Sequence, residues 1–242
     1  MKFPPLHSRH RYLGGALSDT HGVHPDGRRG RGAVGNPSDR YDKEHRENFD
    51  DGWDNVDLPP PPLKTHVLKD TSRSIIARNK SPDISFDRSI NPYRGCEHGC
   101  IYCFARPTHA WLGLSPGLDF ESKIFMKPDA SLLLDKALRA PSYECKTMAM
   151  GTNTDPYQPV ERKYQVTRSV LQVLQRFNHP VGIVTKSALI TRDIDILADM
   201  AAKKLARCAV SVTTLDADLA RKMEPRASTP KRRLEAIRQL SS

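Results

Sequence analysis

The sequence predicts an α/β fold in which a parallel sheet curves into a partial (β/α) barrel within residues 63–242. Two observations predict it. Short apolar runs alternate with helical apolar stripes, which gives about four strand–helix units between residues 89 and 240. Residues 1–62 differ in composition, because they hold eight of the fourteen glycines, eight of the nineteen prolines and few aliphatic residues. The folded domain is therefore expected to begin near residue 63.

The N-terminal segment, residues 1–62, is expected to be a disordered tail, since it buries too little apolar surface to offset its chain entropy. Its last four residues are prolines, which form a stiff spacer. The tail carries nine Lys or Arg and ten Asp or Glu, so the net charge of +10 comes from the 29 basic and 18 acidic residues of 63–242. A basic domain suits a polyanion such as DNA or RNA, and it would also suit a pyrophosphate or an acidic partner protein.

The predicted elements follow one another along the chain. A short strand at 84–86 precedes the first barrel strand at 89–93, and residues 108–127 are expected to be an irregular packed stretch. The second barrel strand, 147–150, is apolar after its first residue, as a buried parallel strand should be. Apolar stripes and proline stops predict the other elements as helix 130–139, helix 160–177, strand 181–185, helix 193–204, strand 208–212 and helix 230–240.

Three of the five cysteines, Cys96, Cys100 and Cys103, form a Cys-x3-Cys-x2-Cys motif after the first barrel strand. Three thiolates at this spacing can ligate three irons of a four-iron four-sulfur (4Fe-4S) cluster and leave the fourth iron open to a small molecule. The alternative is a structural zinc site, with His98 or His109 as the fourth ligand. The sequence has no secretory signal and no run of roughly 18 apolar residues. A reduced, cytoplasmic chain without a membrane span is therefore expected.

The cysteine motif and its surroundings resemble the radical S-adenosylmethionine superfamily, and within it the branch related to spore photoproduct lyase. The segments that carry the resemblance are NPYRGC ending at Cys96, GTNTDPYQP beginning at Gly151, and EPR at residues 224–226. The resemblance implies a 4Fe-4S cluster whose open iron binds S-adenosylmethionine. It also implies an electron donor similar to flavodoxin or ferredoxin. Reductive cleavage would then give a 5′-deoxyadenosyl radical that abstracts hydrogen from a substrate.

The resemblance also implies which residues contact S-adenosylmethionine. Tyr102 matches an aromatic position near the adenine, although it could equally be a core aromatic. The turn after the second strand matches a motif that lies against the methionine ammonium, or else it is a plain connection capped by its aspartate. Lys186 matches a lysine that pairs with the methionine carboxylate, and Ser211 a hydroxyl near the same cofactor. The residues of the turn predicted as contacts are Gly151, Thr152, Asn153 and Asp155.

Two departures from the lyase pattern leave the substrate open. Phe104 stands where the lyases have a tyrosine, and the turn at 151–155 lacks the cysteine that returns hydrogen in the lyase. Cys145 and Cys208 are expected to be inert, so no catalytic residue is predicted. The substrate is not resolved by the sequence, and a nucleic-acid base, as in a DNA repair lyase, is one candidate. The alternatives are RNA, a protein or a small molecule, or a non-catalytic zinc- or cluster-binding nucleic-acid module.

The predicted barrel is incomplete. The resemblance implies six strand–helix units, and the sequence supplies about four, so the last strand is expected to leave an apolar edge. The hypothesis from the sequence is a chain truncated at its C-terminus that lacks the last two strands, and a homodimer that covers this edge is the competing explanation. The oligomeric state is not predicted.

Overall fold

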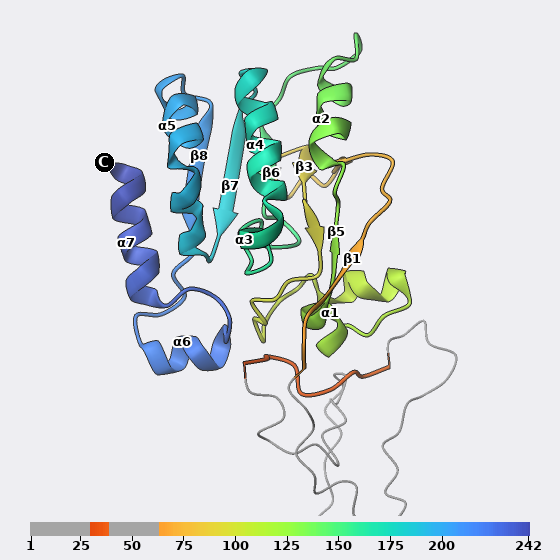
Figure 1. Ribbon diagram of the computed structural model, residues 1–242, viewed down its shortest axis with the longest axis vertical. Coiled ribbons are helices and arrows are strands. Elements are labelled where there is room, and N and C mark those ends of the chain that lie inside the picture. Colours follow the sequence, from red (N-terminus) through yellow and green to blue (C-terminus); the bar gives the residue numbers. More distant parts are fainter. Residues whose placement is uncertain (1–29, 39–62) are drawn as a thin grey trace, which may run out of the picture.

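The computed structural model describes residues 30–38 and 63–242, and its centre is a five-stranded sheet (Figure 1). The strand order is β2-β3-β6-β7-β8, and every neighbouring pair is parallel except β2 and β3. This confirms the predicted α/β fold with a parallel sheet. The strands are β2 (Ile76–Arg78), β3 (Arg88–Ile90), β6 (Met148–Met150), β7 (Val181–Thr185) and β8 (Ala206–Val210).

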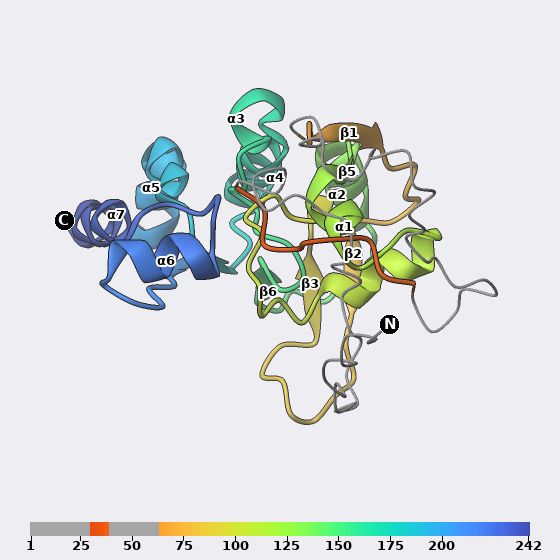
Figure 2. The ribbon, with the colours of Figure 1, turned by 90° about the horizontal axis from the view of Figure 1, so that it is seen from below.

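Four helices cover one face of this sheet (Figures 1 and 2). They are α2 (Ala130–Leu138), α4 (Val166–Arg176), α5 (Ile194–Ala202) and α7 (Pro230–Ser241). The core lies between the two layers, where Leu171 and Leu174 of α4 and Ile183 of β7 are fully buried. Among the described residues the opposite face of the sheet carries no helix, and it is there that the larger cavity described below opens.

A second, smaller sheet was not predicted. It has the order β1-β5-β4, formed by β1 (His66–Lys69), β5 (Lys123–Met126) and β4 (Tyr93–Arg94). The stretch predicted as irregular, residues 108–127, in fact contains most of the 3-10 helix η2 (Arg106–Leu112), followed by α1 (Leu118–Ser122) and β5. Strands this short are stabilised by pairing with distant segments, so their sequences have little periodicity of their own.

Three predicted elements differ from those in the structure. Residues 84–86 form no strand, and Ile84 is exposed. The predicted helix 160–177 is divided at Gln165, whose φ of 50° is left-handed, into α3 (Glu161–Tyr164) and α4. The carboxylate of Glu161 accepts hydrogen bonds from the first turn of α4, which stabilises this break. The strand predicted at 208–212 is β8 at 206–210, because its register with β7 begins two residues earlier.

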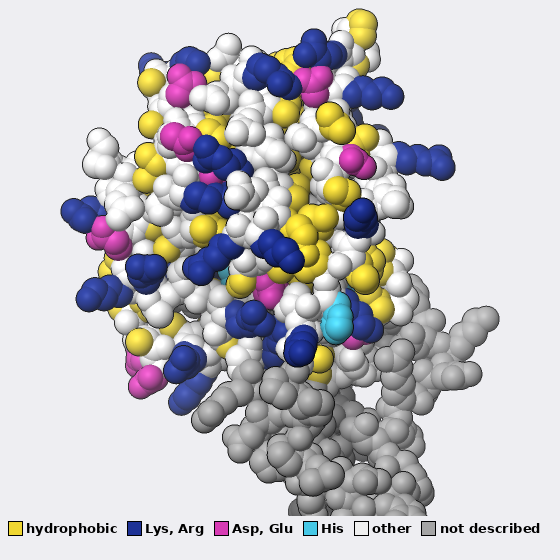
Figure 3. Space-filling model, viewed as in Figure 1, with side chains coloured by type: hydrophobic (Ala, Val, Ile, Leu, Met, Phe, Trp, Pro, Cys, Tyr) yellow, Lys and Arg dark blue, Asp and Glu magenta, His cyan; other side chains and the backbone are white. Residues whose placement is uncertain are grey.

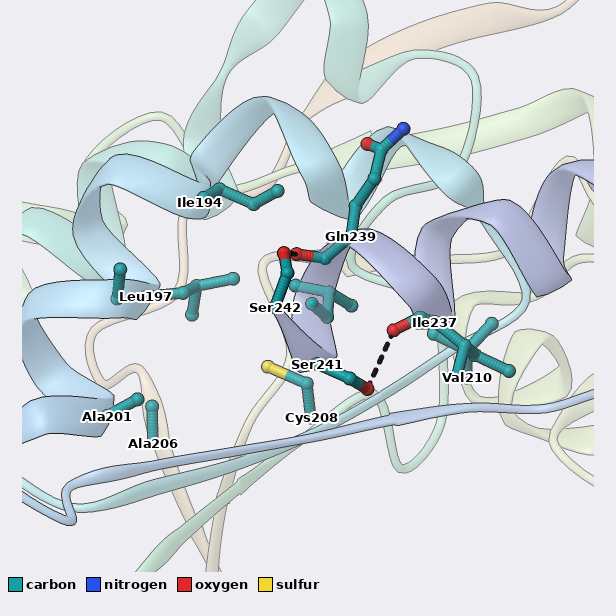
Figure 4. Close-up of a pocket in the computed structure, with 12 residues that line it drawn as sticks. Ile194, Leu197, Ala201, Ala206, Cys208, Val210, Ile237, Gln239, Ser241 and Ser242 are labelled. Atoms are coloured by element: carbon teal, nitrogen blue, oxygen red, sulfur yellow. Dashed lines mark hydrogen bonds between the residues drawn. The ribbon is translucent and has the colours of Figure 1, made fainter.

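The chain beyond β8 contains α6 (Ala217–Met223), which the sequence analysis missed, and then α7. Asp216 caps α6 with its side chain, and Thr229 caps α7 in the same way. Among the described residues β8 is paired on one side only. A small, mainly apolar hollow lies between α5, β8 and α7, and the thiol of Cys208 is directed into it (Figure 4).

Most of the predicted tail, at residues 1–29 and 39–62, lies outside the described residues. Residues 30–38 belong to the same predicted segment, and in the structure they are hydrogen-bonded to α1 and its neighbours. In the described part of the chain, no helix has the length and apolar character needed to cross a bilayer.

Candidate functional site

The three cysteines of the motif line a single cavity of about 210 Å³. They lie on the cluster loop, defined here as residues 95–104, which follows the carboxyl end of β3 and the short strand β4. Cys96 is buried, and Cys100 and Cys103 are partly exposed. The same cavity is lined by Tyr102, by the turn 151–155 at the carboxyl end of β6, and by Lys186 after β7. Residues distant in the sequence therefore meet at one end of the sheet, the end where functional groups of such barrels lie.

Backbone contacts on both sides fix the cluster loop. Gly95 has a φ of +78°, and a Cβ there would lie 2.8 Å from the carbonyl oxygen of Phe120. The amide of Cys96 donates to that same carbonyl at 2.9 Å. Gln158 accepts from the amide of Glu97 at 2.9 Å and donates to the carbonyl of Gly95 at 3.1 Å. The loop is thus held in one conformation by the core rather than by its own sequence.

The cysteines fit an iron–sulfur cluster better than a single zinc ion. Burial raises the pKa of Cys96 well above its ordinary value and that of Cys100 to about 12, so both thiolates need a cation to be stable. In the described residues no three His, Cys, Asp or Glu side chains converge on a single ion site. The zinc alternative requires His98 or His109 as a fourth ligand, and of the two only His98 lines this cavity. His98 contacts Asp155 at 3.3 Å, and His109 hydrogen-bonds the carbonyl of Lys123 at 3.0 Å.

Three predicted site residues surround one buried carboxylate, that of Glu224. The Tyr102 hydroxyl donates to Glu224. The Lys186 ammonium lies 3.6 Å from the same carboxylate, and it donates to the Ser211 hydroxyl at 2.9 Å. It also lies 5.7 Å from the centre of the Tyr102 ring. The structure therefore brings Tyr102, Lys186 and Ser211 together from the cluster loop and the ends of two strands.

Sequence reasoning missed Glu224 as the centre of this group, although the EPR segment at 224–226 was singled out. The carboxylate also accepts from the Thr213 hydroxyl at 2.6 Å and from the Arg233 guanidinium. Arg226, from the same segment, donates its amide to the carbonyl of His98 at 3.1 Å. The EPR segment thus connects the polar residues around Glu224 to the cluster loop.

The turn 151–155 packs closely against the end of β7. Gly151 has a φ of +93°, and a Cβ there would lie 2.1 Å from the carbonyl oxygen of Val184, so this position requires glycine. Thr152 and the amide of Asn153 are hydrogen-bonded to the Asn91 side chain, both at 3.2 Å. The turn is therefore held in place from both the β7 and the β3 sides of the cavity.

Asp155 is already engaged within the protein. Its carboxylate accepts from the amides of Tyr157 at 2.9 Å and Lys186 at 2.7 Å and from the Thr185 hydroxyl at 2.7 Å. Burial raises its pKa, and contact with His98 and these hydrogen bonds outweigh that effect, so the pKa is lowered overall. Asp155 is thus an ionised carboxylate that joins the turn to the end of β7 by hydrogen bonds.

A larger cavity of about 930 Å³ opens on the uncovered face of the sheet. Its lining includes Arg78, Phe86 and Arg207, together with residues of β6 and β7. It shares Phe104, Val184 and the turn residues 151–153 with the cysteine-lined cavity. A group bound in the smaller cavity would therefore face a molecule bound in the larger one.

Comparisons with known proteins show what the chain is similar to. The family model of the radical SAM superfamily matches residues 90–242. Two mycobacterial proteins, the uncharacterized protein Rv2578c of Mycobacterium tuberculosis and Mb2609c of Mycobacterium bovis, are each 40% identical to this chain over 164 residues. The matched region covers 66% of this chain and 48% of each relative, so the chain spans about half their length. The uncharacterized protein MJ0683 of Methanocaldococcus jannaschii is 26% identical over 180 residues, which are 73% of this chain and 63% of that protein.

Among solved structures, the fold is similar to spore photoproduct lyase complexed with dinucleoside spore photoproduct. The TM-score is 0.50 at 18% sequence identity, over 72% of this chain and 47% of that one. A mutant of the same lyase matches equally well, with a TM-score of 0.50 and 19% identity over the same shares of the two chains. These likenesses concern the fold.

Proposed function

The chain belongs to the radical SAM superfamily, whose members bind a 4Fe-4S cluster and S-adenosylmethionine, and we propose that it cleaves S-adenosylmethionine reductively to a 5′-deoxyadenosyl radical. One observation carries the proposal. The three cysteines line the same cavity as Tyr102, Lys186 and the turn 151–155. When bound, the cluster and S-adenosylmethionine supply the electron and the radical, whereas the protein binds, orients and excludes water. We assign Cys96, Cys100 and Cys103 as the cluster ligands and residues 63–242 as the catalytic core.

We assign the S-adenosylmethionine contacts to the remaining residues of this cavity. Lys186, oriented by Ser211, would pair with the methionine carboxylate, and Tyr102 would lie near the adenine. The backbone of Gly151 and the polar groups of Thr152 and Asn153 would accept from the methionine ammonium. Asp155, which the sequence analysis included in this set, has its oxygens engaged inside the protein, so we assign it the role of holding the turn against β7.

The decisive experiment is anaerobic reconstitution with iron and sulfide, followed by reduction with dithionite and addition of S-adenosylmethionine. The expected products are methionine and 5′-deoxyadenosine, detected by mass spectrometry. A chain that takes up the cluster but forms no 5′-deoxyadenosine would contradict the proposal. Iron uptake is measured in the same sample, so loss of the cluster and loss of the chemistry are distinguished.

For the substrate we favour a nucleic-acid base, bound in the larger cavity. Two arginines, Arg78 and Arg207, line this cavity and could contact phosphates, and Phe86 and Phe104 could stack on bases. The folded domain also holds the whole positive excess of the chain. On the helical face, Lys and Arg are scattered rather than gathered in one patch (Figure 3), so the arginines of the cavity are the better candidates.

The alternatives, an RNA, a protein or a small molecule, are tested by isotope transfer. Hydrogen abstraction from a deuterated substrate places deuterium in 5′-deoxyadenosine, so deuterated DNA, RNA and peptide samples are compared directly. The products need not match those of the lyase, because Phe104 lacks a phenol and the turn 151–155 lacks a cysteine. Transfer from peptide but not from DNA would overturn the nucleic-acid assignment.

We further propose that an electron donor similar to flavodoxin or ferredoxin docks beside the cluster loop. Ile101 and Tyr102 lie between Cys100 and Cys103 and are 54% and 46% exposed, which leaves this part of the loop accessible to a protein surface. We also propose that the protein works in the cytoplasm, a reducing compartment that keeps cysteines available as cluster ligands.

The assignment of Lys186 leads to a first prediction. In the cluster-loaded protein, Lys186→Met is expected to weaken S-adenosylmethionine binding by about 10- to 100-fold, because a hydrogen bond to a charged group contributes roughly 1.5–3 kcal/mol and each 1.4 kcal/mol is a factor of ten. Equilibrium binding by calorimetry measures this change. Lys203→Met, on the exposed surface of the same domain, is the control. Equal affinities in the two variants would remove Lys186 from the site.

A further inference from the structure

The short described segment at residues 30–38 lies against the cluster-loop side of the domain, and we call it the N-terminal strap (Figures 1 and 2). Its main contact is the carboxylate of Glu121, which is fully buried. That carboxylate accepts from the amide of Gly32 at 3.0 Å, the amide of Ala33 at 2.8 Å and the guanidinium of Arg106 at 2.5 Å. The strap therefore supplies two of the donors that this buried charge requires.

The strap also touches the cluster loop itself. A Cβ on Gly32 would lie 1.8 Å from the carbonyl oxygen of Gly99, so the two backbones are in direct contact. Arg106, which shares Glu121 with the strap, donates to the carbonyl of Cys100 at 2.9 Å. The strap thus contacts Gly99, the residue before Cys100, directly. It is also linked to the carbonyl of Cys100 through Glu121 and Arg106.

A separate set of contacts leads to the other end of the loop. Arg31 donates to the carbonyl of Glu121 at 2.6 Å and to the Thr65 hydroxyl at 3.1 Å. Thr65 in turn donates at 2.6 Å to the carboxylate of Glu97, the residue that follows Cys96. Further along the strap, Asn36 exchanges two hydrogen bonds with Asp119, of 3.0 and 2.9 Å. The strap is thus attached at several independent points.

We propose that residues 31–33 of the strap are positioning residues for the iron–sulfur cluster. Docked on Glu121 and Gly99, they hold the backbone around Cys100 in the conformation that ligates iron. Groups that orient metal ligands from outside the ligand set typically change metal affinity by about 10- to 100-fold. The inference rests on the proposed cluster site and assigns part of the N-terminal segment to it.

The test compares two alanine substitutions in the full chain. Gly32→Ala places a methyl group against the Gly99 carbonyl, whereas Val34→Ala, the control, shortens a strap side chain that is 38% exposed. After reconstitution, Gly32→Ala is expected to hold its iron about 10- to 100-fold less tightly against a chelator, with faster amide exchange in residues 31–33. The unfolding midpoint of the iron-free protein is measured as well, and a fall is expected, because an undocked strap no longer donates to the buried Glu121 carboxylate. Iron retention is therefore compared at a temperature at which both iron-free proteins are folded. Asn36→Ala removes the strap's contact with Asp119, which is farther from the cluster loop. It should weaken iron retention and speed amide exchange in the strap, but by less than Gly32→Ala.

Two results would overturn the inference. One is fast amide exchange in the strap of Gly32→Ala with wild-type iron retention, which would mean that docking does not position the ligands. The other is unchanged exchange and unchanged retention, which would mean that Gly32 does not contact the loop. If the wild-type chain takes up no iron at all, the proposed function fails first and this inference with it.

Discussion

Cys100→Ala is expected to abolish both the 4Fe-4S cluster and the formation of 5′-deoxyadenosine. Only two thiolates of the motif remain in this variant, so the cluster loses one of the three ligands that the motif supplies. Iron and acid-labile sulfide should therefore fall to background after reconstitution, together with the visible absorption and the electron paramagnetic resonance signal of the reduced cluster. Loss of product without loss of the cluster would indicate that Cys100 acts in some other way.

The matched control is Cys145→Ala. Cys145 is an exposed free cysteine that precedes β6 and does not line the cluster cavity. Removing its thiol should leave iron content and product formation at wild-type values. If Cys145→Ala also lost the cluster, the effect of Cys100→Ala could not be ascribed to ligation. Comparing the two variants thus distinguishes loss of a cluster ligand from the general effect of removing a cysteine.

The parts of the site that were predicted from the sequence are mainly those formed by residues close together in the chain. The cysteine spacing fixes which thiols share a loop, and the turn at 151–155 follows a short apolar strand that is easily recognised. Lys186 and Ser211 were assigned from the resemblance, Lys186 just after the predicted strand 181–185 and Ser211 within the predicted strand 208–212. Position after a parallel strand is enough to bring such residues to one end of the sheet.

What was missed depends on pairing between distant residues. Glu224 and Arg233 meet Tyr102 only in the folded chain, and no periodicity marks a lone buried carboxylate. The small sheet is similar, because β1 and β5 pair across more than fifty residues of chain. Glu121 is a third example: in sequence it is one of several acidic residues, and only the fold shows that its donors come from Gly32, Ala33 and Arg106.

Arg233→Met is expected to destabilise the fold by about 3–5 kcal/mol, because it leaves the charge of Glu224 buried without its partner. Both side chains of this ion pair are almost fully buried. Arg233 also donates to the carbonyl of Ser228 at 2.7 Å and to that of Ser211 at 2.9 Å, so two further acceptors lose a donor. Chemical denaturation of the iron-free protein measures the loss in free energy of unfolding.

The same helix provides the control. Arg238 of α7 forms an exposed pair with Glu235, and Arg238→Met is expected to change the free energy of unfolding by less than about 1 kcal/mol. Similar losses in the two variants would mean that length of the side chain on α7, not burial of the Glu224 charge, determines stability.

The pH dependence distinguishes the ionic contribution of this pair from packing. Burial raises the pKa of Glu224, but hydrogen bonds from Thr213, Tyr102 and Arg233 outweigh that effect, so its pKa lies below the ordinary value of 4.5. A carboxylate with a lowered pKa stabilises the fold above its unfolded-state pKa, and this contribution is lost as the pH falls through the folded-state value. The difference in stability between wild type and Arg233→Met should therefore be largest at neutral pH and shrink as the pH falls below 4.5. If this difference in stability stayed constant with pH, Arg233 would act through packing. Glu224 would then orient Tyr102 and Lys186 without this arginine having to balance its charge.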